Sequence, residues 1–247
     1  AWALLGFVGE VLLTFTSFVL GKASYSRRDL FLFIQEAGFE ALPIVSLISL
    51  LIGMILAFVG AYQLANFGAE IYVADLVAIG MLREMGPVMA GIIMAGRTGA
   101  AFAAQLGSMQ VNEEIDALKT MGISPMEYLV LPRMLALILM MPLLVVYADV
   151  VGVVGGMLVS VFMFDLTLAQ YINQTLGSVG LASMLIGIVK GAFFGLLIAS
   201  AGCFQGMRSG RSAASVGQAT TAAVVMSIVG IVVADSLITI VTTILDI

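Results

Sequence analysis

Five apolar stretches, each long enough to cross a lipid bilayer, constrain this chain more than any other feature of its sequence. A helix of about 20 apolar residues spans the roughly 30 Å hydrocarbon core of a membrane. The sequence lacks the alternating ten-residue pattern of a membrane β-barrel, so the spans must be helices that satisfy their own backbone groups. We therefore predict an all-α integral membrane protein with five transmembrane helices. The spans run from about Pro43 to Leu64, Val73 to Gly96, Met134 to Leu158, Leu181 to Cys203 and Thr221 to Leu245.

The residues before the first span form two further amphipathic stretches. Residues 1–20 are apolar for about the length of a span, but Gly6, Glu10, Thr14 and Ser17 fall on one helical stripe. This pattern favours a helix in the membrane interface, and a sixth span remains the alternative. A second amphipathic stretch covers residues 29–42. We predict one domain over residues 1–247, with interfacial elbow helices up to 42 and the five-span bundle over 43–247; no cleavable signal peptide is expected.

The basic residues outside the spans predict how the chain is oriented. In a five-span topology all of them fall on one side, and the opposite loops carry only acidic residues, Glu70, Asp165 and Asp246. By the positive-inside rule the basic side is cytoplasmic and the C-terminus lies outside, on the periplasmic side. The basic residues in this group are Lys22, Arg27, Arg28, Arg97, Lys119, Arg133, Arg208 and Arg211.

A strongly polar segment, residues 112–122, stands between the second and third spans. Asn112 is expected to cap a short helix, the following carboxylates suit its N-terminal turn, Lys119 suits its last turn, and Gly122 suits a left-handed end. We predict a short cytoplasmic helix that another protein can bind. The residues assigned to this contact are Glu113, Glu114, Ile115, Asp116, Leu118, Lys119 and Met121.

Five charged residues lie inside the spans, each about ten residues from the outer end and so about 15 Å deep. They are Arg83, Glu84, Asp149, Lys190 and Asp235. A central charge costs about 2.5 to 3.5 kcal/mol on insertion scales, which predicts pairing or a watery cavity. We expect Glu84 to pair with Lys190 and Arg83 to meet an anionic ligand; a purely structural set of ion pairs is the alternative.

Glycine and proline features favour an irregular, closely packed bundle. Gly86-Pro87 directly follows the charged pair and predicts a kink or an unwound turn, which membranes tolerate only beside protein or a cavity. Small residues recur over 91–104, 152–156 and 187–195 and predict close helix packing. The 16 Met residues are interpreted as adaptable packing.

The residues that are missing exclude several function classes. With one Cys and no His, the chain has no disulfide framework, no His-ligated metal site and no Ser-His or Cys-His pair. It also has no G-x-x-x-x-G-K-[ST] phosphate loop. ATP-driven transport would therefore need a separate ATPase chain, and the chain itself is not predicted to be an enzyme.

Ordered motifs across the second span and the polar segment resemble the permeases of the MlaE/YrbE family, the membrane subunits of bacterial ABC transporters that move lipids with MCE proteins. The motifs are Leu82-Arg83-Glu84-Met85-Gly86-Pro87-Val88, Ala95-Gly96-Arg97-Thr98-Gly99-Ala100-Ala101, Gly107-Ser108-Met109, Glu113-Glu114-Ile115-Asp116-Ala117-Leu118, Met121-Gly122-Ile123-Ser124-Pro125 and Leu131-Pro132-Arg133. The resemblance covers essentially the whole chain.

The resemblance implies a homodimer in the bacterial inner membrane, bound by two cytoplasmic ABC ATPases that carry ATP and Mg, and by a hexameric MCE ring. A small STAS-type cytoplasmic subunit is a further expected partner. The segment Asn112–Met121 matches the family's coupling helix, and Arg83, Glu84 and Lys190 match its intramembrane charges. The expected cargo is a phospholipid or related lipid, whose transport contributes to outer-membrane lipid asymmetry, and Leu56, Val59 and Tyr62 are expected to contact its acyl chains.

Two other function classes remain open from the residues alone. A gradient-driven secondary transporter would use the intramembrane charges, Asp149 and Asp235 included, as its relay. An intramembrane aspartyl enzyme would need Asp149 and Asp235 as its dyad.

Overall fold

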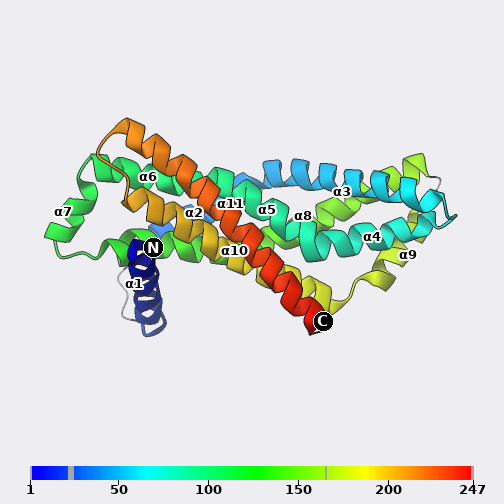
Figure 1. Cartoon of the computed structure of the whole chain (residues 1–247), viewed down its shortest axis with the longest axis horizontal. Coiled ribbons are helices and arrows are strands. Elements are labelled where there is room, and N and C mark those ends of the chain that lie inside the picture. Colours follow the sequence, from blue (N-terminus) through cyan, green and yellow to red (C-terminus); the bar gives the residue numbers. More distant parts are fainter. Residues whose placement is uncertain (1, 22–24, 165, 246–247) are drawn as a thin grey trace. The chain divides into compact units, whose positions relative to one another are not determined.

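The structure is a computed structural model that describes residues 2–21, 25–164 and 166–245 (Figure 1). The described residues form helices joined by short turns, with no strand among them. Five helical segments are long and apolar enough to cross a membrane, which confirms the predicted fold class and number of spans. These segments are Arg27–Ala65, Glu70–Val111, Met126–Met163, Leu181–Met207 and Ala213–Ile244.

The individual helices follow the predicted order, with longer spans than expected. The α-helices are α1 Trp2–Val19, α2 Arg27–Ala37, α3 Leu42–Ala65, α4 Val73–Gly80, α5 Gly86–Met94, α6 Ala100–Val111, α7 Glu114–Thr120, α8 Leu131–Met163, α9 Leu168–Ser178, α10 Leu181–Met207 and α11 Ala213–Ile244. Single 3₁₀ turns cover Phe39–Ala41 and Glu70–Tyr72, and π-helical turns cover Met81–Met85, Ala95–Gly99 and Met126–Val130.

The largest boundary error concerns the second span, which was expected to end near Gly96. The helix instead continues to Val111 through a π-helical turn at Ala95–Gly99. Arg97 does not end it, because the guanidinium finds partners within the chain, as described below. Of the sequence predictions, those on residues 1, 22, 165 and 246 lie outside the described residues.

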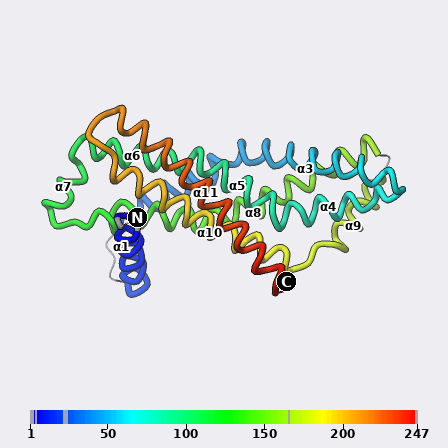
Figure 2. The backbone as a smooth tube through the Cα atoms, viewed as in Figure 1, coloured from blue at the N-terminus to red at the C-terminus, as the bar shows by residue number. Residues whose placement is uncertain are grey.

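The chain divides into two compact units, and α8, α10 and α11 contribute residues to both; their courses can be followed in Figure 2. Unit 1 comprises Ala1–Glu40, Met94–Met140 and Gly195–Gly230. Unit 2 comprises Ala41–Ile93, Met141–Phe194 and Ile231–Ile247. Each unit has its own set of tightly packed side chains.

Unit 1 is built around a buried arginine. Arg133 is 5% exposed and lies over the ring of Phe33, 4.4 Å from its centroid, and near the ring of Phe102. Its guanidinium donates to the carbonyl of Leu129 at 2.7 Å and to Gln105 Oε1 at 3.1 Å. These partners let a charged side chain occupy the core between α2, α6 and α8.

Unit 2 is built on close backbone approach between helices. A Cβ atom at Gly53 would overlap the carbonyl of Gly152, and one at Gly155 would overlap the carbonyl of Leu50. The α3 and α8 backbones are therefore in contact. This agrees with the close packing predicted from the small residues at 152–156. In contrast, Gly96 of unit 1 is exposed, and a Cβ atom there would meet open space.

The α9 helix closes one end of unit 2. A capping box fixes its start, because Thr167 and Gln170 each bond the other's backbone N–H. Tyr171 is 1% exposed, and its hydroxyl donates to the carbonyl of Val153 at 3.3 Å. Burial raises the pKa of Tyr171 well above its usual value, so this hydroxyl keeps its proton.

The irregularity expected at Gly86-Pro87 takes the form of a π-helical turn that immediately precedes it. The turn covers Met81–Met85, and the N–H of Gly86 donates to the carbonyl of Met81. Pro87 has no N–H of its own, and the widened turn keeps the neighbouring backbone groups paired. The turn carries the Arg83-Glu84 pair, and π-helical turns are frequent at functional sites.

Candidate functional site

The intramembrane charges of unit 2 converge on Lys190. Its side chain is fully buried, and its ammonium lies 2.8 Å from Glu84 Oε2 and 2.8 Å from Asp235 Oδ1. It also donates to the carbonyl of Arg83 and to Thr239 Oγ1, both at 2.9 Å. The predicted pairing of Glu84 with Lys190 is thus confirmed. We call Glu84, Lys190, Asp235 and Thr239 the lysine cluster.

The lysine cluster has more acceptors than its ammonium can satisfy. An ammonium has three N–H groups, whereas four oxygen atoms lie within 2.9 Å of Nζ. Asp235 Oδ1 is the atom left over: it is close enough for an ion pair, but it is buried without a directed hydrogen bond. Thr239 also donates to Glu84 Oε1 at 3.1 Å, so the hydroxyl ties the two carboxylate-bearing helices to one another.

Sequence reasoning missed Thr239 and placed the five charges in one undivided layer. A threonine inside an apolar helix carries no signal of its own, since its hydroxyl usually bonds the preceding turn. Arg83 is half-buried and has contacts of its own, and its backbone carbonyl is bonded to Lys190. Its predicted contact with an anionic ligand stays a prediction.

Asp149 forms no ion pair with the lysine cluster. It is 7% exposed and packs against Gly86, where a Cβ atom would overlap its Oδ1. It lines a cavity of about 300 Å³ whose other walls include Leu82, Val153 and Met184. Lys190, Glu84 and Asp235 are not among the residues that line this cavity.

The residues predicted to contact acyl chains lie on different faces of α3. Val59 is 55% exposed and Tyr62 is 68% exposed, so both face away from unit 2. Leu56 is half-buried and packs against the core that includes Ala57 and Met81. The shallow cavity that Val59 lines includes Leu51, Met54, Ile55, Phe58 and Val159 but none of the intramembrane charges.

The short polar helix predicted between the second and third spans is present as α7, with a different N-terminus. Asn112 is wrong as the N-cap: it ends α6, and its side chain donates to Glu114 Oε1 at 3.1 Å. Glu113 holds the N-cap position, with a φ of 60°. The reason is that α6 runs up to Val111, so Asn112 ends that helix and the left-handed Glu113 leads into α7.

The C-terminal end of α7 is as predicted. Gly122 has a φ of 76°. Its N–H donates to the carbonyl of Lys119 and that of Ile123 donates to Leu118, both at 3.0 Å. This is a Schellman motif, which satisfies the last carbonyls of α7.

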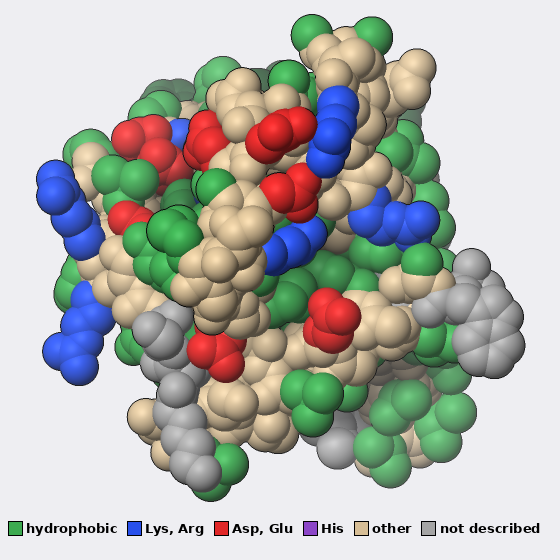
Figure 3. Space-filling model, turned by 90° about the vertical axis from the view of Figure 1, so that its left-hand side faces the viewer, with side chains coloured by type: hydrophobic (Ala, Val, Ile, Leu, Met, Phe, Trp, Pro, Cys, Tyr) green, Lys and Arg blue, Asp and Glu red, His purple; other side chains and the backbone are tan. Residues whose placement is uncertain are grey.

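An arginine that sequence analysis used only for topology holds α7 in place. Arg211, in the turn between α10 and α11, lies 3.2 Å from Glu113 Oε1 and 2.9 Å from Asp116 Oδ2. Lys119 also pairs with Asp116, at 3.2 Å. Acidic and basic side chains both gather on the face that carries α7 (Figure 3).

The residues assigned to partner contact on α7 divide by exposure. Ile115 is 1% exposed and anchors the helix to unit 1, and Leu118 is half-buried. Glu113, Glu114, Lys119 and Met121 are exposed, the last at 64%. The helix is thus anchored on one side and exposes acidic side chains on the other.

Arg97 forms a second polar site in unit 1. It donates to the carbonyl of Glu36 at 2.6 Å and to Glu40 Oε2 at 3.0 Å. These bonds join the end of α2 to the π-helical turn at Ala95–Gly99. This pairing explains why a basic residue lies within the longer helix. The backbone carbonyl of Glu36 and the carboxylate of Glu40 are about 60 residues away in sequence, too far to be foreseen as partners.

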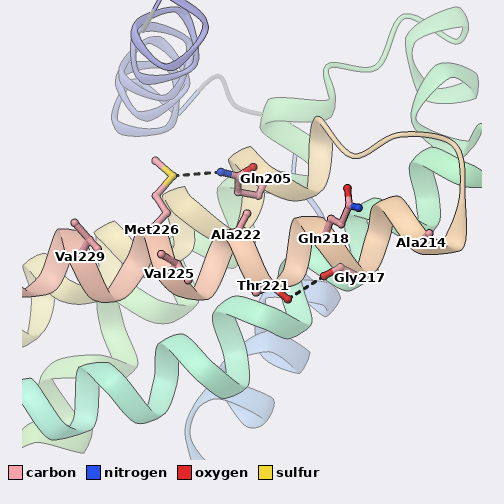
Figure 4. A pocket seen from close by; sticks show the side chains of 9 residues that line it. All are labelled: Gln205, Ala214, Gly217, Gln218, Thr221, Ala222, Val225, Met226 and Val229. Atoms are coloured by element: carbon pink, nitrogen blue, oxygen red, sulfur yellow. Dashed lines mark hydrogen bonds between the residues drawn. The ribbon is translucent and has the colours of Figure 1, made fainter.

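One face of α11 lines an open groove in unit 1 (Figure 4). Gly217, Gln218, Thr221 and Val225 lie along it, and Gln205 of α10 donates to Met226 Sδ at 3.6 Å beside it. Small and β-branched residues at helical spacing allow another helix to approach closely. The lining of the groove contains no charged residue.

Comparisons with known proteins agree with this architecture. The family described as Permease MlaE matches residues 31–241. A probable ABC transporter permease protein of Rickettsia typhi is 41% identical over 202 residues, which are 82% of this chain and 78% of the relative. The intermembrane phospholipid transport system permease protein MlaE of Haemophilus influenzae is 33% identical over 76% of this chain and 72% of the relative. The chloroplastic protein TRIGALACTOSYLDIACYLGLYCEROL 1 of Arabidopsis thaliana is 32% identical over 82% of this chain and 58% of the relative.

Proposed function

Since this chain belongs to the MlaE permease family, we propose that it is the membrane subunit of an ATP-driven transporter that moves phospholipids between the bacterial inner membrane and a periplasmic MCE protein. Transport of this kind contributes to the lipid asymmetry of the outer membrane. The similarity to the Haemophilus influenzae permease, whose name specifies intermembrane phospholipid transport, supports the cargo. The chain breaks no bond in the lipid, and ATP with Mg binds to a separate ATPase.

The observation that carries the ATP-driven part of the proposal is α7. This helix is anchored by Ile115 and by Arg211, and it presents Glu114 and Met121 to the outside. It is joined to the second span through α6 and to the third through the π-helical turn at Met126–Val130. Closure of two ATPases would push the α7 helices of a homodimer together and narrow the lipid cavity between the permeases. The groove on α11 supports the homodimer, because its small residues suit close helix contact.

The lysine cluster supports a lipid site in unit 2. Arg83 lies on the same π-helical turn as Glu84 and is half-buried, so that part of its side chain is open to a phosphate headgroup. The exposed side chains of Val59 and Tyr62 provide apolar surface for acyl chains. In this proposal a hexameric MCE ring receives the lipid, the C-terminus is periplasmic, and a small STAS-type subunit binds on the cytoplasmic side.

The decisive experiment compares two α7 variants of the purified permease–ATPase–MCE complex in proteoliposomes. Glu114→Arg reverses an exposed charge whose contact within the chain is a hydrogen bond from Asn112. We expect lipid transfer to the MCE protein and lipid-stimulated ATP hydrolysis to fall at least tenfold. Asn112→Ala removes the same internal bond without reversing the charge, and it should leave both rates unchanged.

The outcomes separate the proposal from its rival. Normal coupling in Glu114→Arg would remove α7 as the lever. Transport that ran on an ion gradient without any ATPase would instead support a secondary transporter that uses the lysine cluster as its relay.

Loss of headgroup-selective lipid binding in Arg83→Ala, with retention in Arg83→Lys, is expected if Arg83 contacts the phosphate.

A further inference from the structure

The α1 helix and three of the spans enclose an apolar groove in unit 1, which we call the α1 groove. Its volume is about 410 Å³, and the side chains of α1, α8, α10 and α11 that line it carry no charge. Small residues at Ser200, Ala201 and Gly230 leave this space between the spans and the rings of Phe7 and Phe15. Ordered water in a cavity needs about two to four polar partners, and Ser200 is the polar side chain of this lining. The groove is therefore suited to hydrocarbon.

The α1 groove lies at the depth of lipid acyl chains and is open to them. Its α10 residues run from Leu196 to Ala201, six to eleven residues before that helix ends at Met207. At 1.5 Å per residue they lie about 9–17 Å from the helix end, within one leaflet of a hydrocarbon core about 30 Å thick. Val8 and Leu12 line the groove and are 44% and 62% exposed, so a lipid chain can enter from the side. Figure 1 shows α1 lying across α10, as a helix held within one leaflet does.

A basic residue lies where α10 leaves the membrane, on the side of the groove. Leu197, Ala201, Phe204 and Arg208 follow one another at intervals of four, three and four residues, so they continue one helical face. The Arg208 guanidinium lies 5.1 Å from the centroid of the Phe204 ring, and that ring meets the ring of Phe7 edge-on at 5.3 Å. Phe7 lines the groove, so this series of contacts connects the cation with the apolar space.

Among the described residues, no carboxylate pairs with Arg208, whose side chain is exposed. Glu10 is the acid of α1, and at about 100° per residue it lies on the opposite side of the helix from the face that lines the groove. Glu113 and Asp116 pair with Arg211 instead. An arginine without a carboxylate attracts an anionic headgroup, whereas the ammonium of a zwitterionic headgroup would find no acceptor of opposite charge there.

We propose that the α1 groove binds one acyl chain of an anionic phospholipid of the bilayer, whose phosphate lies against Arg208. The apolar lining contacts the chain, and the guanidinium donates to the phosphate oxygens. The second chain of the lipid stays in the bilayer, beside the exposed side chains of Val8 and Leu12. The bound lipid joins α1 to α8, α10 and α11 and thereby stabilises unit 1.

This site is distinct from the lysine cluster. Arg208 and the residues that line the α1 groove belong to unit 1, whereas the lysine cluster belongs to unit 2. The lipid in the groove is a resident component of the protein and not its cargo, so the inference does not rest on the proposed function. If ATP-driven lipid transfer were absent, lipid binding in the groove would still be expected.

The test compares two photoactivatable lipids on the full-length protein in phosphatidylcholine nanodiscs. Phosphatidylglycerol and phosphatidylethanolamine carry the same diazirine-bearing acyl chain, and mass spectrometry of peptides locates the crosslinks. On residues 7–15 of α1 and 196–201 of α10, we expect about fivefold more labelling by phosphatidylglycerol, the preference that one arginine gives an anionic lipid. The exposed, uncharged surface of α3 over residues 47–59 is the reference, where both lipids should label equally.

Three variants separate the proposed site from general attraction of lipid to a basic surface. Arg208→Ala should lower the preference for phosphatidylglycerol to the value on α3, and Arg208→Lys should retain most of it, because a cation remains. Arg211→Ala removes another exposed arginine, whose partners lie on α7, and is the matched control that should keep the preference.

A fourth variant tests the groove itself. Ser200→Phe fills the space from α10 and should lower labelling of residues 7–15 by both lipids. Equal labelling by the two lipids at the groove, an unchanged preference in Arg208→Ala, an equal loss in Arg211→Ala, or unchanged labelling in Ser200→Phe would each overturn the proposal.

Discussion

The two units differ in where their ion pairs lie and in how their charges balance. Unit 1 holds eight basic and eight acidic residues, whereas unit 2 holds two and seven. In unit 1 the pairs formed by Arg97, Lys119 and Arg211 have side chains that are 32% to 65% exposed. In unit 2 the pairs meet at Lys190, which is completely buried.

Ion pairs therefore contribute differently to the stability of the two units. An exposed ion pair contributes about 0–1 kcal/mol, because water screens it and two side chains lose freedom. A buried pair adds little net stability over an apolar pair, but removal of one partner costs about 3–5 kcal/mol. We therefore expect unit 2 to depend on its charges and unit 1 to use them for position and partner contact.

The largest expected effect comes from the same substitution at two lysines. Lys190→Met leaves two partly buried carboxylates, 33% and 19% exposed, without a counter-ion. It should destabilise the protein by about 3 kcal/mol, the low end of the range for a buried pair, because water partly screens both acids. Lys119→Met removes an exposed pair between residues three apart on α7 and should cost about 0.5 kcal/mol or less. Unfolding midpoints in detergent measure the difference.

A rescue variant distinguishes charge from packing at Lys190. In the triple variant Lys190→Met, Glu84→Gln, Asp235→Asn, the cluster carries no charge at nearly the same volume. It should recover more than half of the lost stability. Equal, small effects of Lys190→Met and Lys119→Met would show that the lysine cluster is hydrated and would remove the contrast between the two units.

The second prediction tests the close packing of unit 2 against an open position in unit 1. Gly53→Ala places a methyl group on the carbonyl of Gly152, and it should destabilise by about 1–3 kcal/mol. Gly9→Ala in α1 meets open space and should stabilise that helix by up to about 1 kcal/mol. Thermal unfolding of the two variants should shift in opposite directions; a stabilising Gly53→Ala would mean that α3 and α8 separate at little cost.

Much of the fold can be predicted from the sequence, because a lipid bilayer allows few arrangements of the chain. Apolar length sets the spans, and burial in hydrocarbon forces the pairing of Glu84 with Lys190. Gly122 and the last turn of α7 were likewise predictable, since they depend on residues adjacent in sequence. The N-terminus of α7 was not, because Asn112 can cap a helix or end one, and the extent of α6 decides which.

The long-range contacts could not be read from residue types. Arg211 meets Glu113 and Asp116 about 95 residues away, and Thr239 meets Glu84 from another helix. That Asp149 forms no ion pair with Lys190 was equally unpredictable, because separation in sequence does not show which residues meet in the fold. The apolar spans of the sequence show which charged residues lie in the membrane. Only the packing of the helices shows which of these charges share a site.

The third prediction concerns the left-handed end of α7. Gly122 has a φ of 76°, where a Cβ atom costs about 1–2 kcal/mol. Gly122→Ala should therefore raise hydrogen exchange over residues 114–122 several-fold, while exchange in unit 2 stays unchanged. Gly122→Asn tolerates this conformation better and should show the smaller increase. Equal exchange in both variants would mean that the Schellman motif does not hold α7.

The smallest effect on stability is expected for the arginine that pairs with α7. Arg211→Ala removes exposed ion pairs to Glu113 and Asp116 and should cost less than about 1 kcal/mol. Hydrogen exchange of α7 should nevertheless rise two- to threefold, and added salt should produce the same rise in the unaltered protein. Arg208→Ala, which removes a cation from the ring of Phe204, is the matched control and should leave α7 unchanged. If Arg211→Ala left exchange in α7 unaltered, Ile115 alone would hold the helix, and the exposed charges of unit 1 would serve partner contact without positioning α7.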